Sequence, residues 1–269
     1  MPRSHVAIAL GLWMGISLAG WSATDGLAGE KTAYQVEDRR SGFTYVTPET
    51  AAMQDDDFAN PAFILVDQGE ELWSETDGEA GKSCACCHQN AAKSMQGVGT
   101  RYPVYDAKLG KIKSIESQIN SCRTERMQAK PFKWESDEML AMSVYVRHQS
   151  RGMPMNVKID GPAAPLFEKG KAFYNQRRGQ LDMACKHCHV DNDGKTARAN
   201  LLTQGQSTGF PLYRFKWQKV GSIHRRFRGC NKNIRATPYK YGSDEYMNLE
   251  LYVAWRGRGL PVETPAVRN

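Results

Sequence analysis

Beyond its first 30 residues, the sequence has no apolar run long enough to cross a lipid bilayer. Cysteine and histidine are scarce, with seven and six copies among 269 residues. Charge of one sign does not dominate either, because 36 basic residues against 29 acidic ones leave a moderate net charge of +7. A surface of this charge can attract an acidic protein partner or a small anion.

The apolar stretch at residues 6–18 follows Arg3 and His5 and precedes small residues around Ala28 and Gly29. A short apolar core with a basic start and a small-residue exit is typical of a secretory signal peptide. We therefore predict a signal peptide at residues 1–29 and a periplasmic mature chain without a membrane span. Export also argues against nucleic acid as a partner.

Two copies of Cys-x-x-Cys-His stand out against this scarcity, at residues 84–88 and 185–189. Composition alone predicts roughly 0.004 chance matches per chain. In c-type cytochromes the two thiols bind the haem covalently, and the adjacent histidine ligates the iron. We therefore predict two covalently attached c-type haems. Their predicted binding residues are Cys84, Cys87 and His88 for the first haem, and Cys185, Cys188 and His189 for the second.

Zinc and structural disulfides are the alternatives to haem. A zinc site needs four converging ligands, usually from two cysteine pairs about 15–20 residues apart. Here the pairs lie about a hundred residues apart, and each is followed by histidine. Covalent haem attachment also takes place outside the bacterial cytoplasmic membrane, in agreement with the predicted signal peptide.

The chain repeats itself at an interval of 101 to 108 residues. Each copy has a glycine 15 positions before its first haem cysteine and ends in Arg-Gly-x-Pro. The matching segments are 65–73 with 166–174, 102–105 with 210–213, and 138–146 with 245–253. The repeat predicts a mainly α fold of two tandem cytochrome c-like domains related by internal duplication.

In each copy we expect an early helix to cross a late helix beside the haem motif. The late helices are predicted to begin after Ser136 and Ser243, whose hydroxyls can accept the free N–H groups of the first turn. Gly69 and Gly170 in the early helices lack a Cβ and permit a close approach. The predicted domains are 61–154 with the first haem and 166–269 with the second, joined by a linker at 155–165 and preceded by a loop-rich N-terminal extension at 30–60 that wraps over the first domain.

Each haem motif is followed by one more cysteine, Cys122 in the first copy and Cys230 in the second. Both lie where a cytochrome c chain crosses the distal face of the haem, so we predict them as the sixth iron ligands. A thiolate ligand lowers the iron potential. A Cys122–Cys230 disulfide and ligation by methionine remain alternatives. The seventh cysteine, Cys86, is expected to be a bystander packed by the haem. The alternative ligands are Met127, Met139, Met153 and Met247.

Cys230 differs from Cys122 in its surroundings, because residues 224–232 contain three arginines, a lysine and a histidine. A charge run of this kind is often only a solvated surface. Beside a sulfur nucleophile it can also bind an anion, and Arg226 lies one helical turn before Cys230. Its planar guanidinium can bind two oxygens of an oxyanion. We therefore predict Cys230 and Arg226 as a site for an anionic sulfur compound.

The haem motifs, residues 121–123 (Ser-Cys-Arg) and residues 225–231 (Arg-Arg-Phe-Arg-Gly-Cys-Asn) together resemble the SoxA family. SoxA is the dihaem subunit of the SoxAX cytochromes that start bacterial thiosulfate oxidation, and the resemblance covers nearly the whole mature chain. It implies an L-cysteine S-thiosulfotransferase in which Cys230 is the active-site haem ligand, isolated in relatives as a persulfide, and Arg226 holds thiosulfate. It also implies a SoxX-like monohaem cytochrome as heterodimer partner and electron acceptor, and a SoxYZ-like carrier protein whose cysteine receives the thiosulfate.

Other functions stay open from the residues alone. A plain dihaem electron-transfer cytochrome would use Cys230 only as a ligand and the arginines for docking. A dihaem peroxidase would need one iron with an open distal position. A disulfide-stapled binding module would contain no haem.

Overall fold

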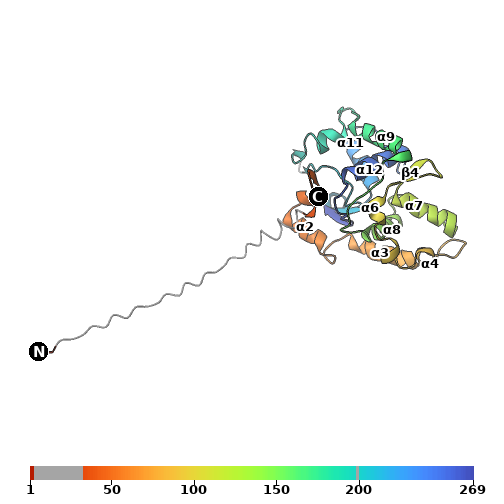
Figure 1. The fold of residues 1–269 in the computed structure, drawn as a ribbon, viewed down its shortest axis with the longest axis horizontal. Helices are drawn as coiled ribbons and strands as arrows, with labels where there is room; N and C mark the ends of the chain where they lie inside the picture. The colour runs from red at the N-terminus through yellow and green to blue at the C-terminus, as the bar shows by residue number, and fades with distance from the viewer. Residues whose placement is uncertain (3–32, 198–199) are drawn as a thin grey trace.

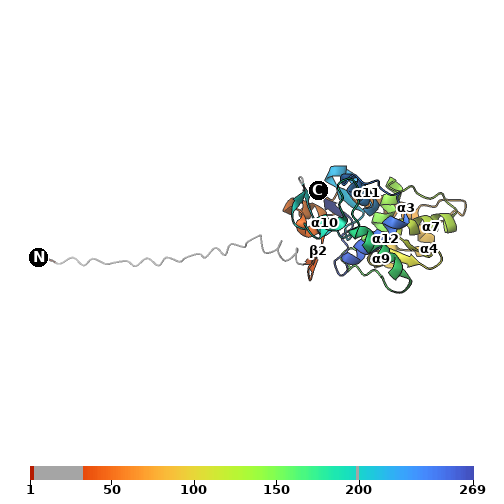
Figure 2. The same cartoon turned by 90° about the horizontal axis from the view of Figure 1, so that it is seen from above.

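The computed structural model describes residues 1–2, 33–197 and 200–269, which Figures 1 and 2 draw in colour. The predicted signal peptide, apart from residues 1–2, lies outside the described residues. Within residues 33–197 and 200–269, no helix has the length and apolar character needed to span a bilayer.

Helices dominate the described chain, and its strands form only small sheets. The elements up to the end of the first domain are β1 (Gln35–Val36), β2 (Arg39–Arg40), η1 (Gly42–Tyr45), α2 (Pro48–Asp55), α3 (Phe63–Ser74), α4 (Cys84–His88), α5 (Ala91–Ser94), α6 (Val98–Arg101), β3 (Val104–Asp106), β4 (Lys111–Lys113), α7 (Ile115–Cys122), the π-helix η2 (Arg123–Met127) and α8 (Asp137–His148). The second domain contributes η3 (Gly161–Ala163), α9 (Ala164–Asn175), α10 (Cys185–His189), β5 (Thr196–Ala197), β6 (Asn200–Leu201), β7 (Leu212–Arg214), η4 (Phe215–Trp217), β8 (Lys219–Gly221), α11 (Ile223–Asn233), α12 (Asp244–Arg256) and β9 (Ala266–Arg268).

The same succession of elements occurs in both domains. An early helix packs on a late one, α3 on α8 and α9 on α12, as Figure 1 shows. A short helix carries each haem motif (α4 and α10), and an antiparallel hairpin (β3–β4 and β7–β8) leads into a further helix (α7 and α11). The mainly α architecture with two similar domains agrees with the prediction.

The early and late helices cross in direct contact, as the glycines predict. A Cβ on Gly69 would stand 2.5 Å from the carbonyl oxygen of Ala141, and one on Gly170 would stand 2.0 Å from that of Asn248. Only glycine allows two helix backbones to approach this closely. The late helices begin as predicted, because Ser136 and Ser243 each accept a backbone N–H of the first turn.

Helices α7 and α11, which carry Cys122 and Cys230, also begin at serine caps. Ser114 caps α7 and Ser222 caps α11, and Cys122 and Cys230 each lie eight residues after their cap. Beyond the cysteines, the first domain has one extra residue before the chain turns. The π-helix η2, with its wider turn, accommodates this residue, so that both cysteines keep the same position on their helices.

The N-terminal extension packs mainly on the second domain, and the expectation that it wraps over the first domain is wrong. The Tyr45 hydroxyl donates to Asp193 at 2.6 Å. Gln54 is 1 % exposed and accepts the backbone N–H of Val267 at 3.2 Å. These polar partners belong to the second domain, and no local pattern in residues 30–60 reveals them.

The two Arg-Gly-x-Pro endings pair with each other. Gly152 N donates to Val262 O at 2.8 Å, and Met155 N donates to Leu260 O at 2.9 Å. Met155 and Val157, at the start of the predicted linker, are buried in a hydrophobic core shared with the second domain. The linker therefore begins as part of the contact between the domains, and its last residues already form η3 and the start of α9.

Candidate functional site

The third residue of each haem motif caps its own helix. Ser83 Oγ accepts the N–H of Cys86 at 3.2 Å, and Cys86 Sγ accepts the N–H of Ser83 at 3.4 Å. In α10, His187 Nδ1 accepts the N–H of Ala184 at 3.0 Å. Cys86 and His187 thus act as the capping side chains of their motifs, and the expectation that Cys86 is packed by the haem stays a prediction.

His189 is oriented by a hydrogen bond to the following loop. Its Nδ1 lies 2.6 Å from the carbonyl oxygen of Thr203, which can only accept, so Nδ1 carries the proton. This tautomer leaves Nε2 free as a metal ligand. Gly205 has φ +73°, and a Cβ there would stand 2.8 Å from the imidazole ring. The loop therefore fits closely against the ring and holds its orientation.

Cys230 lies beside His189. Helix α11 brings its thiol within hydrogen-bond reach of the imidazole. The same thiol lies close to the motif cysteine Cys185. Burial and the neighbouring charge of Cys230 together raise the pKa of Cys185 to about 12. The imidazole of His189, the Cys230 thiol and the two motif cysteines therefore lie near one another. This donor set fits a covalently bound haem with one nitrogen and one sulfur on its iron.

The three arginines of α11 have different surroundings. Arg225 lies 3.7 Å from Glu135 and over the Trp217 ring, and Arg228 donates to the carbonyl of Tyr239. Among the described residues, the guanidinium of Arg226 makes no hydrogen bond or ion pair with another protein group. The basic run is therefore not a uniform solvated surface, because Arg225 and Arg228 contact other elements and Arg226 is close enough to Cys230 to affect its thiol.

Arg226 changes the acidity of Cys230. Burial raises the pKa of the Cys230 thiol, but the positive charge of Arg226, a hydrogen bond with His189 and the charge of Arg214 outweigh that effect and lower the pKa to about 7. This is the reverse of Cys185 and Cys188, whose pKa values burial and Cys230 raise. Cys230 is therefore the sulfur that carries negative charge most readily in this cluster.

Arg214 is a residue that sequence reasoning missed. It is 9 % exposed, ends strand β7 and lies close enough to Cys230 and Arg226 to affect both. Its burial and the neighbouring Arg226 lower its own pKa to about 10. The repeat contains a signal that could have revealed Arg214. The equivalent strands β3 and β7 end in Asp106 and Arg214, so the second domain has a cation where the first has an acid.

The first site is less cationic. Gln118, four residues after the cap of α7, is equivalent to Arg226, and its amide donates to Cys122 Sγ at 3.2 Å. Cys122 also lies beside Cys84, whose pKa burial and this neighbour raise to about 11. The sulfur of Cys122 thus meets a neutral amide where that of Cys230 meets a guanidinium.

No disulfide joins any two of the seven cysteines, and Cys122 and Cys230 lie beside different haem motifs. The alternative disulfide between them is therefore absent. The two haem motifs belong to separate domains, and Figure 2 shows α4 and α10 well apart. Within the described ranges, no three histidine, cysteine or acidic side chains gather around a metal position.

The methionines Met127, Met139 and Met247 are buried at 4 %, 1 % and 5 % exposure, and Met247 packs in the core of the second domain.

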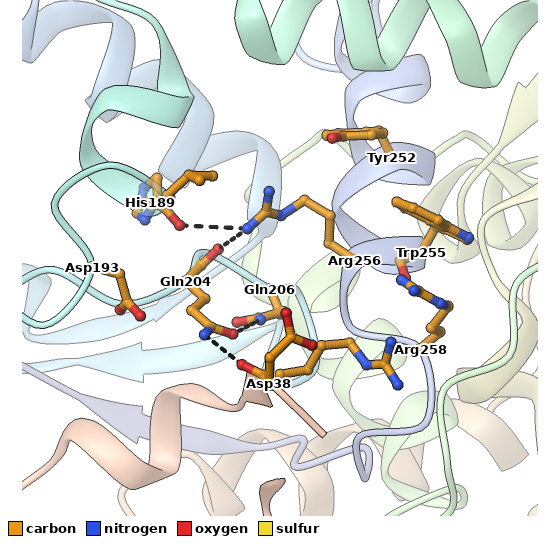
Figure 3. A pocket seen from close by; sticks show the side chains of 11 residues that line it. Asp38, His189, Asp193, Gln204, Gln206, Tyr252, Trp255, Arg256 and Arg258 are labelled. Carbon is orange, nitrogen blue, oxygen red and sulfur yellow. Dashed lines mark hydrogen bonds between the residues drawn. The ribbon is translucent and has the colours of Figure 1, made fainter. Parts of the chain in front are cut away.

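A cavity of about 280 Å³ lies behind His189 (Figure 3). Arg256 spans it from α12 and donates to the carbonyl oxygens of His189 and Gln204, and the N-terminal extension adds Asp38. Neither Cys230 nor Arg226 lines this cavity. It is therefore separate from the face on which the sulfur and the cations meet.

Comparisons with known proteins show the family of this chain and its overall fold. The family described as SoxA/TsdA, cytochrome c domain, matches residues 68–155 and 169–262. The SoxA subunit of L-cysteine S-thiosulfotransferase from Pseudaminobacter salicylatoxidans is 47 % identical over 85 % of this chain and 80 % of its own length. That from Rhodovulum sulfidophilum is 43 % identical over 88 % and 83 %. The crystal structure of SoxXA from P. pantotrophus matches with a TM-score of 0.83 and 43 % identity, covering 91 % of this chain and 90 % of that one.

Proposed function

Because the chain belongs to the SoxA family of cytochrome c proteins, we propose that it is the dihaem subunit of an L-cysteine S-thiosulfotransferase. The enzyme joins thiosulfate oxidatively to a cysteine thiol of a SoxYZ-like carrier protein. The observation that carries this proposal is the meeting of Cys230, His189 and Arg226 in the second domain, where a sulfur of lowered pKa faces an unpaired guanidinium.

Both motifs bind haem covalently in this proposal. Cys84, Cys87 and His88 would hold the first haem, with Cys122 as a further iron ligand. Cys185, Cys188 and His189 would hold the second, with Cys230 as its further iron ligand. The matching order of elements and the equal positions of the two ligand cysteines support an origin by internal duplication, with domains near 61–154 and 166–269.

The protein side chains bind and orient the reactants. Arg226 binds sulfonate oxygens of thiosulfate through its two parallel N–H groups. Arg214 adds positive charge to the same anion, and Cys230 presents its sulfur to the outer sulfur of thiosulfate. When bound, the haem supplies an acceptor for electrons. Because Gln118 and Asp106 replace the two arginines in the first domain, that domain lacks the anion site.

The overall reaction requires an electron acceptor outside the second domain. A thiol and thiosulfate form one S–S bond, and the product carries the thiosulfate as an S-thiosulfonate on the cysteine. The thiol loses its proton, and two electrons leave the pair of sulfur atoms. A single ferric haem would accept only one of them, so a SoxX-like monohaem cytochrome is the proposed partner and onward acceptor. The match to the SoxXA structure supports this partner.

The proposed location is the periplasm. The predicted signal peptide and the two haem-attachment motifs support it, since covalent haem attachment follows export. There the chain forms a heterodimer with the small cytochrome and meets the carrier protein.

The test is an assay of thiosulfate conjugation to the carrier thiol, with the purified heterodimer. Cys230→Ser should abolish turnover while both haems stay attached, because attachment uses only the motif cysteines. Arg226→Ala should mainly raise the KM for thiosulfate, by roughly tenfold to a hundredfold for the loss of a bidentate charged interaction. Full activity of either variant would exclude that residue from the reaction.

Cys86→Ser is the matched control, because serine keeps a capping side chain on α4 and removes an exposed thiol that has no proposed role. It should behave like the unmodified protein. Reduction by a protein donor without thiosulfate turnover would instead support a plain electron-transfer cytochrome. Peroxide turnover with an open coordination position would support a peroxidase.

A further inference from the structure

The first domain reaches into the second at the start of α11, the helix that carries Arg226 and Cys230. Glu135 Oε1 accepts the backbone N–H of Ser222, the N-cap of α11, at 3.2 Å. Its Oε2 lies 3.7 Å from Arg225, with only 11 % of the Glu135 side chain exposed. The carboxylate thus contacts both the backbone and a cation of the first turn of α11.

Trp134 holds the same turn through its ring. The indole stacks on the His224 ring with centroids 4.9 Å apart and an interplanar angle of 10°. His224 is fully buried and is fixed from two other directions, by the N–H of Gly242 on Nδ1 and by Glu250 of α12 at 3.2 Å from Nε2. The first turn of α11 is therefore held between the first domain and α12.

Glu135 adopts a backbone conformation that is unusual for a residue with a side chain. It has φ +64°, in the left-handed region that favours glycine. The equivalent position in the second domain, directly before the cap of α12, is Gly242, with φ +71°. A non-glycine residue in this conformation costs about 1 kcal/mol. The contacts of the Glu135 carboxylate with α11 offset that cost, whereas the second domain uses the residue that the backbone prefers.

We propose that Trp134 and Glu135 form an interdomain clamp that positions α11, and through it Arg226, for thiosulfate binding. This inference rests on the proposed function. Arg226 lies one turn after the capped end, so a change in the tilt of that end moves its guanidinium relative to Cys230. Pairing of Arg225 with Glu135 also keeps that neighbouring cation away from the anion site. The first domain then serves turnover by holding this helix, whatever the role of its haem.

The decisive variant is Glu135→Gly, measured in the haem-loaded heterodimer with thiosulfate and the carrier thiol. It copies the residue of the second domain and relieves the backbone, but it removes both contacts with α11. We expect the KM for thiosulfate to rise on the order of tenfold, for the loss of one hydrogen bond to a charged acceptor, with a smaller change in kcat. The haem absorption spectrum should keep its ligation bands.

Two further variants separate positioning from stability. Glu135→Gln keeps an oxygen for Ser222 N and should recover most of the wild-type KM. Gln128→Gly is the matched control, because Gln128 is also left-handed, with φ +55°, and lies in the first domain away from α11. It should relieve the backbone in the same way and leave the KM unchanged.

The outcomes are distinguishable from failure of the proposed function. If the unmodified heterodimer does not conjugate thiosulfate, the proposed function fails. If it does, and Glu135→Gly retains the wild-type KM, the clamp is refuted. An equal rise in KM for Gln128→Gly would also refute it, because the effect would then follow from loop flexibility alone.

Discussion

The crossing of α9 and α12 makes a sharp prediction for Gly170. Alanine at this position would place its Cβ 2.0 Å from the carbonyl oxygen of Asn248 and 2.6 Å from the carbonyl carbon. Such atoms rest at roughly 3.5 Å when they are not bonded, so the helices must separate by about 1 Å or more. The obstacle is helix backbone, which cannot rotate away as a side chain can.

The expected loss of stability combines two opposing effects. Overpacking of a core costs about 1–3 kcal/mol, and a backbone obstacle belongs in the upper part of this range. Alanine is the better helix former and returns about 1 kcal/mol. The net loss of about 1–2 kcal/mol corresponds to a fall in Tm of roughly 2–8 °C for a chain of this size.

Thermal unfolding of the haem-loaded protein, followed by far-UV circular dichroism, measures this loss. Lys169→Ala is the matched control, because Lys169 is the exposed neighbour on the same helix and should change the Tm little. Gly69→Ala should behave like Gly170→Ala, since its Cβ would meet α8 at 2.4–2.5 Å. A Gly170→Ala protein with a Tm equal to or above that of the wild type would refute the close crossing.

Two predictions concern buried charge. Arg214→Gln should raise the KM for thiosulfate by roughly tenfold and leave the KM for the carrier thiol unchanged, because Arg214 acts on the anion. Steady-state kinetics with either substrate varied tests this. Equal effects on both KM values would contradict it. Burial and the nearby Glu250 raise the pKa of Glu116 above 4.5, so its contribution to stability is greatest below that pH and falls as the pH rises through the raised value. Glu116→Gln stays neutral, faces the same Glu250, Arg147 and His224, and should therefore gain stability relative to the wild type between about pH 4 and about pH 8. Urea denaturation of both proteins at about pH 4 and about pH 8 measures the difference in their free energies of unfolding. A difference that does not change with pH would contradict the raised pKa of Glu116.

Features that depend on neighbours in the chain could be predicted from the sequence. The haem motifs rest on covalent chemistry at adjacent residues, and the helix starts at Ser136 and Ser243 rest on local hydrogen bonds. The one-turn spacing of Arg226 and Cys230 follows from helix geometry. The repeat added the helix crossing, because Gly69 and Gly170 occupy the same position before each motif.

The errors of prediction came from contacts between distant segments. The extension at residues 30–60 has no strong periodicity, and its place is decided by polar groups such as Gln54 that find partners near residue 267. Arg214 was overlooked because its neighbour Cys230 lies on a different element.

The sequence by itself determined the chemical inventory of this protein: two Cys-x-x-Cys-His motifs, one further cysteine after each motif, and a basic run around the second of these cysteines. Tertiary structure alone decided that Arg225 and Arg228 contact other elements, that Arg214 lies close to Cys230, and that Glu135 of the other domain contacts the helix. The physical reason is that hydrogen bonding and helix periodicity act within a few residues. Electrostatic contacts instead depend on distances in space between elements that the chain keeps far apart.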